Sequence, residues 1–316
     1  MIARPTRIAL VFLLALPAPA SATTICEAVW RDETRRRDLP VRIRMPDGAG
    51  KVAAVLWSPG LGGSRSGGEV WAAGWASQGL AVIQLEHPGS DAAVYAGARD
   101  AEDRRARVLA AASGAQLIAR AADVSFIADQ LASRGREGAC DLSRIDSDRL
   151  GLAGHSMGAW TVQALAGQHF LPAGPLLQDR RFRAFIAFSP NARAGVPPAQ
   201  LFGEIHRPFL AITGTRDGVP ISGDPALRAS ALAQRTGVFA GLPADGRKAL
   251  AVFDGADHMM FAGNRRKPDD RLGLRAQGQS LAITRAWWRR WLLGDEAAEA
   301  ALKAPALGTA DRWERK

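Results

Sequence analysis

The sequence predicts an α/β fold with a mostly parallel central sheet and helices on both faces. Short, continuously apolar runs, such as residues 51–57 and 80–85, alternate along the chain with segments whose apolar residues repeat at helical spacing. Continuously apolar strands are typical of parallel sheets, which are buried on both faces. Of the 316 residues, 47% are hydrophobic, which is enough for one large core. We therefore expect a single domain over residues 23–316.

The N-terminus has the pattern of a secretory signal peptide. Arg4 and Arg7 flank the start of the apolar stretch at 8–16, and Ala20 and Ala22 supply the small residues of a cleavage site. The apolar stretch is about half as long as the roughly 20 residues that a membrane-spanning helix needs. We expect cleavage after Ala22 and a periplasmic or secreted protein without a membrane span.

The two cysteines of the chain, Cys26 and Cys140, both lie beyond this segment. Cysteines in an oxidising compartment most often pair. We predict a Cys26–Cys140 disulfide that ties the mature N-terminus to the body of the protein. Two free thiols are the alternative, and neither cysteine is a candidate for catalysis.

The chain is basic, with 41 Lys and Arg against 31 Asp and Glu and a formal charge of +10. Loss of the two leader arginines would leave 39 against 31, or +8. The basic clusters, such as 35–37 and 265–267, are short, separated and mixed with acids, and no aromatic side chains are interleaved with them. We expect no nucleic-acid partner. Binding of an envelope polyanion is an alternative that would depend strongly on salt.

The first elements of the mature chain are strands and one helix. Residues 41–45 alternate apolar and basic side chains before a Pro-Asp-Gly turn, as in a half-exposed strand. Residues 51–57 form a buried strand, and residues 69–78, with tryptophans one turn apart, form the first covering helix. Gly79 ends that helix, and residues 80–85 form the next buried strand.

Two helical segments follow. Residues 100–107 form a charged, exposed stretch. Residues 116–131 form a long amphipathic helix, which we expect to turn Arg120, Asp123 and Asp129 away from its apolar face.

A buried strand at 149–153 then leads into Gly154-His155-Ser156-Met157-Gly158, and a helix-like run follows at 159–166. The G-x-S-x-G pattern between a strand and a helix is typical of a nucleophile elbow, in which the serine lies at the apex of a sharp turn. The turn needs small residues two positions before and after the serine, and Gly154 and Gly158 supply them. The alternative is that Ser156 is only a helix N-cap.

A glycine-rich loop, residues 58–68, follows the strand at 51–57. In sheets that carry such an elbow, the loop at this position supplies one backbone donor to an oxyanion. We therefore interpret the N–H of Leu61 as one donor and the N–H of Met157, directly after Ser156, as the other. A flexible loop without this role is the alternative.

Three more strands are predicted after the elbow, at 182–188, 208–214 and 248–253, the last of the sheet. The connection between the first two has only about 20 residues, which is too short to hold a large lid. Residues 295–316 indicate a terminal helix and a loosely held tail.

An acid and a histidine follow the last two of these strands. Asp217 comes just after the second strand, and His258 lies on the loop after the third. The order Ser156, Asp217, His258 is the order of the catalytic triad on this type of sheet. Asp224 and Asp257 are rival acids.

This set of side chains can cleave an ester without a cofactor or a metal. A serine hydroxyl is a weak nucleophile at neutral pH, so His258 must take its proton during attack and return it to the leaving alkoxide. Asp217 would fix the imidazole tautomer and stabilise the imidazolium.

Several stretches together resemble one family. These are residues 57–64, the Glu86-His87 pair, residues 154–158 and residues 254–258. They look like the motifs of the secreted bacterial α/β-hydrolases grouped with platelet-activating-factor acetylhydrolases and predicted dienelactone hydrolases. The resemblance implies the α/β-hydrolase fold and the same triad and oxyanion-hole assignments.

Two departures narrow what the resemblance implies. Pro59 stands where the acetylhydrolases usually have histidine, which argues against a phospholipid substrate. A serine rather than a cysteine nucleophile argues against dienelactone hydrolysis. The Ser-Pro-Gly and Gly-His-Ser-Met-Gly elements are also similar to those of secreted cutinases and polyesterases, whose oxyanion loop usually carries an aromatic residue where Leu61 lies.

We therefore expect a serine carboxylic ester hydrolase that forms an acyl-enzyme with short-chain or otherwise accessible esters. His87, Trp160 and Phe261 are candidate substrate contacts; a structural role is more typical of His87, and core packing is equally typical of the other two. The alternatives are an amidase or peptidase with the same triad, and a non-catalytic exported binding protein on the same fold.

Overall fold

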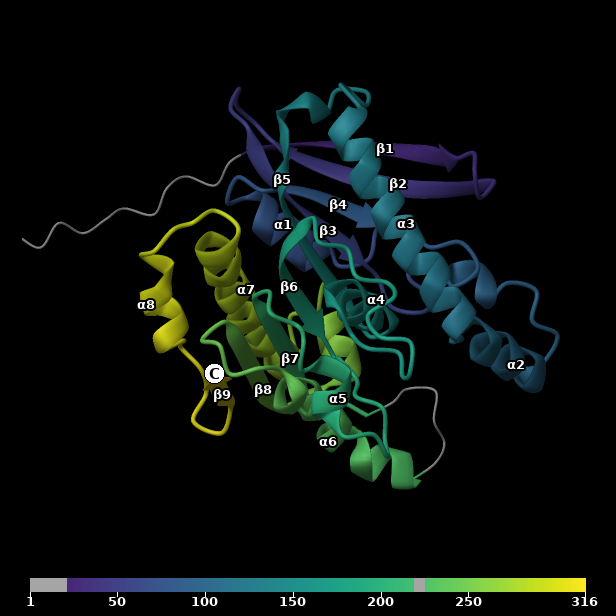
Figure 1. Cartoon of the computed structure of the whole chain (residues 1–316), viewed down its shortest axis with the longest axis vertical. Coiled ribbons are helices and arrows are strands. Elements are labelled where there is room, and N and C mark those ends of the chain that lie inside the picture. The colour runs from purple at the N-terminus through teal and green to yellow at the C-terminus, as the bar shows by residue number, and fades with distance from the viewer. Residues whose placement is uncertain (1–21, 219–224) are drawn as a thin grey trace, which may run out of the picture.

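The computed structural model describes residues 22–218 and 225–316. Its strands are β1 (Thr23–Asp32), β2 (Arg37–Pro46), β3 (Val52–Ser58), β4 (Ala81–Leu85), β5 (Ile145–His155), β6 (Phe182–Phe188), β7 (Phe209–Arg216), β8 (Lys248–Asp257) and β9 (Arg312–Arg315). Within the described residues they form one nine-stranded sheet in the order β1-β2-β4-β3-β5-β6-β7-β8-β9 (Figure 1). The run from β4 to β8 is parallel, and β1, β2 and β9 are antiparallel to their neighbours.

Helices cover both faces of this sheet (Figure 1). They are α1 (Glu69–Ala76), α2 (Ala101–Ala111), α3 (Gly114–Ser133), α4 (Met157–Ala166), α5 (Pro198–Phe202), α6 (Pro225–Gly241), α7 (Arg271–Trp291) and α8 (Ala298–Lys303), with short 3₁₀ turns η1 (Ala92–Val94), η2 (Leu142–Arg144) and η3 (His258–Ala262). One apolar core lies between the sheet and α3 to α6, and the other lies between the sheet and α1, α7 and α8. The predicted α/β class, with a mostly parallel sheet, is confirmed.

Strand β3 shows why the buried strands have no polar face. Ala54 and Leu56 pack into the core under α3 to α6, whereas Ala53, Val55 and Trp57 pack into the opposite core. Successive side chains of a strand point to opposite faces, so a strand covered by helices on both sides needs an apolar residue at every position. This requirement produces the continuous apolar runs from which the sheet was predicted.

The C-terminal tail differs from the expectation. Arg312–Arg315 form β9, which pairs with β8, so β8 is not the last strand and the tail is not loosely held. Trp313 Nε1 donates to Leu302 O at 2.9 Å, and Arg315 forms an ion pair with Glu299 at 2.6 Å. The pairing covers the edge of β8, which would otherwise present unpaired backbone groups.

The predicted signal peptide, residues 1–22, falls outside the described residues except for Ala22. No helix in the described ranges has both the length and the apolar character to cross a membrane. Strand β1, at the start of the described residues, was not predicted, and neither α6 nor α7 was predicted.

A disulfide joins Cys26 on β1 to Cys140, in the turn before η2. The predicted pairing is therefore confirmed, and the alternative of two free thiols is wrong. The bond ties the edge strand of the sheet to the segment that leads into β5.

Replacing both cysteines, Cys26→Ser with Cys140→Ser, should lower the free energy of unfolding by about 2–4 kcal/mol. The two cysteines are separated by 114 positions, and the unfolded chain gains the entropy of opening that loop. Urea unfolding of the oxidised protein and the double variant would measure the difference. A reductant should destabilise the wild type and leave the variant unchanged; equal midpoints for the two proteins would contradict the prediction.

Candidate active site

Ser156 occupies the turn between β5 and α4. Its backbone has φ 56° and ψ −115°, a region that residues with a β-carbon rarely adopt. Its N–H donates to Phe188 O at 3.0 Å, and its carbonyl accepts from the N–H of Trp160 at 3.0 Å. Backbone strain of this kind persists only where the surrounding structure holds it, and it clusters at functional sites. The turn places Ser156 on the wall of a pocket.

The two glycines of the elbow are required by close backbone contacts. A β-carbon on Gly158 would lie 1.9 Å from Ser58 O, and one on Gly154 would lie 2.5 Å from Gly158 O. No side chain fits at either position, so β3, β5 and the first turn of α4 meet through backbone atoms. Close packing of the backbone therefore explains why the motif has glycine at both positions.

Asp217 and His258 meet beyond the carboxyl ends of β7 and β8. His258 Nδ1 donates to Asp217 Oδ1 at 2.7 Å. The buried carboxylate also accepts from Thr213 Oγ1 at 2.7 Å and lies 3.3 Å from Arg235 Nε. Burial acts to raise the pKa of Asp217, but the hydrogen bond from His258 and the Arg235 charge lower it to about 2. Asp217 is therefore ionised at neutral pH and keeps a proton on Nδ1 of His258.

Ser156 and His258 line the same pocket. Because Nδ1 of His258 is bonded to Asp217, Nε2 is the ring nitrogen left to accept a proton. Within the described residues, no hydrogen bond joins the Ser156 hydroxyl to His258. Bonds between a nucleophile and its base are often long without substrate and tighten when it binds.

His155, the second residue of the elbow, packs against His258. Its Nε2 donates to the backbone carbonyl of His258 at 2.9 Å, and the ring centroids are 4.6 Å apart. Burial and the neighbouring His258 lower the pKa of His155 to about 3, so the ring is neutral and Nε2 carries the proton that it donates. The contact fixes the backbone of His258 relative to the elbow.

Of the two rival acids, Asp257 has its carboxylate bonded elsewhere than to the His258 ring. Asp257 caps η3, because its carboxylate accepts from the N–H groups of Met259 at 3.0 Å and Met260 at 3.1 Å. Asp224 lies outside the described residues.

The predicted oxyanion donors lie beside Ser156. The N–H of Leu61 donates to no acceptor among the described residues, whereas the next N–H, that of Gly62, donates to Ser90 O at 2.8 Å. Met157 begins α4, where backbone N–H groups lack an acceptor within the helix. Leu61 and Met157 both line the pocket with Ser156. The two residues that carry the predicted donors therefore border the same pocket.

This pocket has a volume of about 970 Å³. Its rim includes the exposed apolar side chains of Tyr95, Leu171 and Met259. Among the described residues that line it, none is Asp or Glu. The connection between β6 and β7, residues 189–208, holds only the short helix α5, as expected for a site without a large lid.

The three candidate substrate contacts have different positions. Trp160 is partly exposed and lines the pocket. His87 and Phe261 are both 0% exposed and are not among the described lining residues, so the interpretation of these two as substrate contacts is wrong. Phe261 packs against Phe253, and His87 belongs to a buried polar network.

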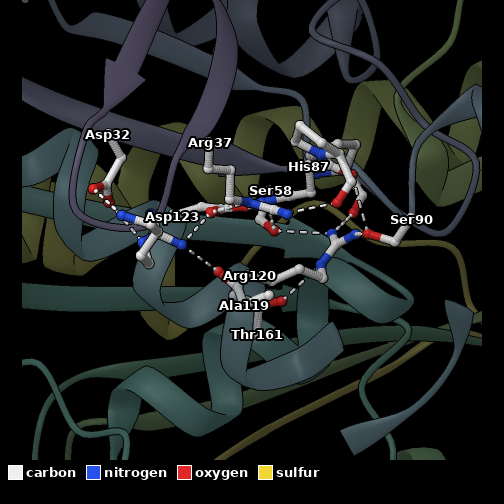
Figure 2. Close-up of polar contacts among 12 residues, drawn as sticks. Asp32, Arg37, Ser58, His87, Ser90, Ala119, Arg120, Asp123 and Thr161 are labelled. Atoms are coloured by element: carbon white, nitrogen blue, oxygen red, sulfur yellow. Dashed lines mark hydrogen bonds and ion pairs between the residues drawn. The ribbon is translucent and has the colours of Figure 1, made fainter. Parts of the chain in front are cut away.

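Arg120 is at the centre of this network, which the sequence analysis missed. The expectation that it faces away from the apolar side of its helix is wrong, because its side chain is 0% exposed. Its guanidinium donates to Ser58 Oγ, Pro59 O, Ser90 Oγ and Thr161 Oγ1 (Figure 2). These acceptors are hydroxyls and a carbonyl far away in sequence, so helical periodicity alone could not reveal them.

Asp123, one helical turn after Arg120, is also 0% exposed, and its predicted outward position is wrong as well. It accepts from Arg35 and Arg37 at 2.7 Å each and from His87 Nδ1 at 2.9 Å. The signal in the sequence was the cluster of arginines at 35–37, which we interpreted as surface charge although two of its members reach a buried acid.

Ser58, His87 and Asp123 have the bonding pattern of a catalytic triad. His87 Nε2 lies 3.0 Å from Ser58 Oγ, and its Nδ1 donates to Asp123. All three side chains are 0% exposed, and none is among the described residues that line the pocket. A substrate has no access to Ser58, so this set is structural.

The two buried histidines should make the protein sensitive to acid. Burial lowers the pKa of His87 to about 4, with help from the Arg120 charge, and that of His155 to about 3. An unfolded histidine titrates near 6.5, so below that pH the unfolded chain binds protons that the folded protein does not. The free energy of unfolding should fall as the pH drops from about 6.5 towards 4, by up to about 1.4 kcal/mol per pH unit for each histidine.

Urea unfolding at pH 7 and pH 5 measures this effect. In His87→Gln the fall should be smaller, because one of these two buried histidines is then missing. Equal stability of the wild type at the two pH values would contradict the prediction.

Comparison with known proteins does not identify a family for this chain. A scan against protein-family models and a search of curated proteins both found no match to the chain. The chemistry of the site therefore has to be inferred from its own residues: a serine in a strained turn, a histidine bonded to a buried carboxylate, and an open pocket that the serine and the histidine share.

Proposed function

We propose that this protein is a serine carboxylic ester hydrolase with the α/β-hydrolase fold. Ser156 would be the nucleophile, His258 the general base and Asp217 the acid that orients it. The observation that carries the proposal is the 2.7 Å hydrogen bond between His258 and a buried, ionised Asp217, in the pocket that Ser156 also lines. A nucleophile, a base and a group that orients the base are the parts that acyl transfer needs.

The proposed reaction gives each of these groups one role. Ser156 Oγ attacks the ester carbonyl carbon and passes its proton to His258 Nε2, while the carbonyl oxygen becomes an oxyanion that accepts from the N–H groups of Leu61 and Met157. The carbon–oxygen bond to the alcohol breaks, and His258 gives the proton to the leaving alkoxide. Water then attacks the acyl-enzyme with His258 as base, which releases the acid and restores Ser156.

The pocket supports esters that are small or readily accessible. The described connection between β6 and β7 holds no large lid, and apolar side chains on the rim of the pocket can contact an acyl or alcohol group. The absence of Asp and Glu from its described lining means that no fixed negative charge there would repel a neutral or anionic ester.

The proposal includes the family and the compartment. The motifs at 57–64, 154–158 and 254–258 support a place among the secreted bacterial hydrolases grouped with platelet-activating-factor acetylhydrolases and predicted dienelactone hydrolases. Export to the periplasm or the medium is supported by the Cys26–Cys140 disulfide, since such bonds persist in oxidising compartments.

The mature protein should hydrolyse p-nitrophenyl esters, with turnover that falls as the acyl chain lengthens, and Ser156→Ala should lower kcat at least about 1,000-fold because the nucleophile is lost. A fluorophosphonate probe mapped by mass spectrometry should label Ser156 and not the buried Ser58. Ser66→Ala, which removes another hydroxyl from the pocket wall, is the matched control and should keep both activity and label. A wild type with neither label nor turnover would exclude the enzyme and favour a binding protein.

Asp217→Asn should lower kcat by about 10,000-fold, because an amide can leave the histidine in the wrong tautomer. Asp257→Asn is the matched control: it changes the neighbouring acid, which caps η3, and kcat should stay within a few-fold of the wild type. Steady-state kinetics on p-nitrophenyl acetate measures both. A larger loss of kcat in Asp257→Asn than in Asp217→Asn would contradict the assignment of Asp217 as the acid of the triad.

A further inference from the structure

The segment that carries Leu61 is held on both sides by contacts that lead to Arg120. Before it, Pro59 O accepts from Arg120 Nη2. After it, Gly62 donates to the backbone carbonyl of Ser90 at 2.8 Å, and Ser90 Oγ accepts from Arg120 Nη1 at 2.9 Å. The backbone that presents the Leu61 N–H is therefore connected to one guanidinium from both directions.

The segment that carries Met157 is connected to the same guanidinium. Arg120 Nε donates to Thr161 Oγ1 at 3.1 Å (Figure 2). That hydroxyl donates its own proton to Met157 O at 3.1 Å. Thr161 lies one turn along α4 from Met157. The hydroxyl thus joins Arg120 to the first turn of α4, which bears the second predicted donor.

The directions of these hydrogen bonds follow from the protonation states. Arg120 can only donate, and burial lowers its pKa to about 9, which leaves it charged at neutral pH. Ser58 Oγ accepts from Arg120 at 3.1 Å and gives its proton to Nε2 of neutral His87, whose Nδ1 proton is held by Asp123. Each group on this side of Arg120 therefore has a defined donor or acceptor role.

Arg120 has no carboxylate in direct contact within the described structure, and its acceptors are neutral. A fully buried guanidinium is costly to desolvate, and a pair with an acid would offset more of that cost. Its hydrogen bonds go instead to Pro59, which lines the pocket, and to residues that adjoin or bond the segments of Leu61 and Met157. A residue that positions two backbone segments must form hydrogen bonds to both, and Arg120 does so directly or through Ser90 and Thr161.

We propose that Arg120 is a positioning residue of the oxyanion hole, which sets the separation of the Leu61 and Met157 N–H groups by binding both of their backbone segments. The inference rests on the proposed function. Arg120 does not touch the substrate. It acts by keeping two donors, contributed by different parts of the chain, aimed at one oxygen before the reaction begins.

The test removes one connection without removing the guanidinium, since replacing Arg120 would leave several buried acceptors unpaired and endanger the fold. Thr161→Val keeps the shape of the side chain but loses the bridging hydroxyl. We expect kcat on p-nitrophenyl acetate to fall about tenfold at an unchanged KM, a fraction of the 100- to 1,000-fold loss expected when a whole donor is removed.

A trifluoromethyl ketone gives a second readout. Ser156 Oγ adds to its carbonyl carbon, the serine proton passes to His258, and the ketone oxygen becomes an oxyanion in the proposed hole. Affinity for this inhibitor should fall by the same factor as kcat/KM, whereas affinity for the corresponding neutral alcohol, which forms no oxyanion, should not change.

Thr284→Val is the matched control. Thr284 is also a fully buried helical threonine, which accepts from Trp75 Nε1 at 2.9 Å and donates to Leu281 O at 3.1 Å, but it lies on α7 in the opposite core. It should lose a comparable amount of stability and keep its kcat. Ser90→Ala, which removes one of the two connections on the Leu61 side and leaves the one through Pro59 O, should lower kcat in the same direction as Thr161→Val.

The outcomes separate this inference from the proposed function. A wild type without turnover or fluorophosphonate label would overturn both. An active wild type with kcat unchanged in Thr161→Val and Ser90→Ala, or reduced equally in Thr284→Val, would overturn the positioning role alone. A loss of kcat and of inhibitor affinity confined to the two network variants would establish it.

Discussion

The backbone contact between Ser58 and Gly158 is the constraint on which the site depends. With Ser58 O where a β-carbon of residue 158 would lie, the first turn of α4 can approach the end of β3 only without a side chain. This approach brings Met157 next to the glycine-rich loop that starts after Ser58. It also holds both ends of the elbow against the sheet, so Ser156 keeps a backbone conformation that a freer turn would relax.

Two buried aspartate–histidine pairs show that bonding pattern alone does not make a catalytic site. His258 donates to Asp217, and His87 donates to Asp123, at 2.7 and 2.9 Å. In both pairs burial would favour the neutral acid, and a hydrogen bond from histidine together with an arginine charge keeps the carboxylate ionised. The difference is access, since the first histidine lies on the pocket wall and the second is enclosed. The same bonding pattern therefore borders an accessible pocket at one place, where we propose catalysis, and lies enclosed in the core at the other.

Much of the fold and the site could be predicted because local patterns determine them. Apolar runs mark strands buried on both faces, and the glycines around Ser156 record backbone contacts that exclude side chains. Parallel strands place their carboxyl ends at one edge, so Asp217 and His258 could be located by counting strands. Strand β9 was not predicted because it is short and charged and has no strand pattern of its own. It forms by pairing with the edge of β8, which is a long-range contact.

The buried charges were missed for a different reason. An analysis of helical periodicity assigns charged residues to the outer face of a helix, because most charged side chains in proteins are exposed to solvent. Arg120 is an exception: acceptors separated from it by 30 to 62 positions surround its guanidinium. No local sequence pattern predicts such a cluster, because Ser58, Ser90 and Thr161 come together only in the three-dimensional structure.

The position of this cluster follows from the open form of the pocket. Oxyanion donors stabilise a transition state only if they are already in place when charge develops. A lid that closes over the substrate can hold a loop from the solvent side, but the short connection between β6 and β7 offers none here. Glycines in the loop add freedom, because residues such as Gly62, at φ 74°, lack the steric limits of other residues. In the oxyanion hole that we propose, the support comes from beneath the loop, where α3 carries Arg120.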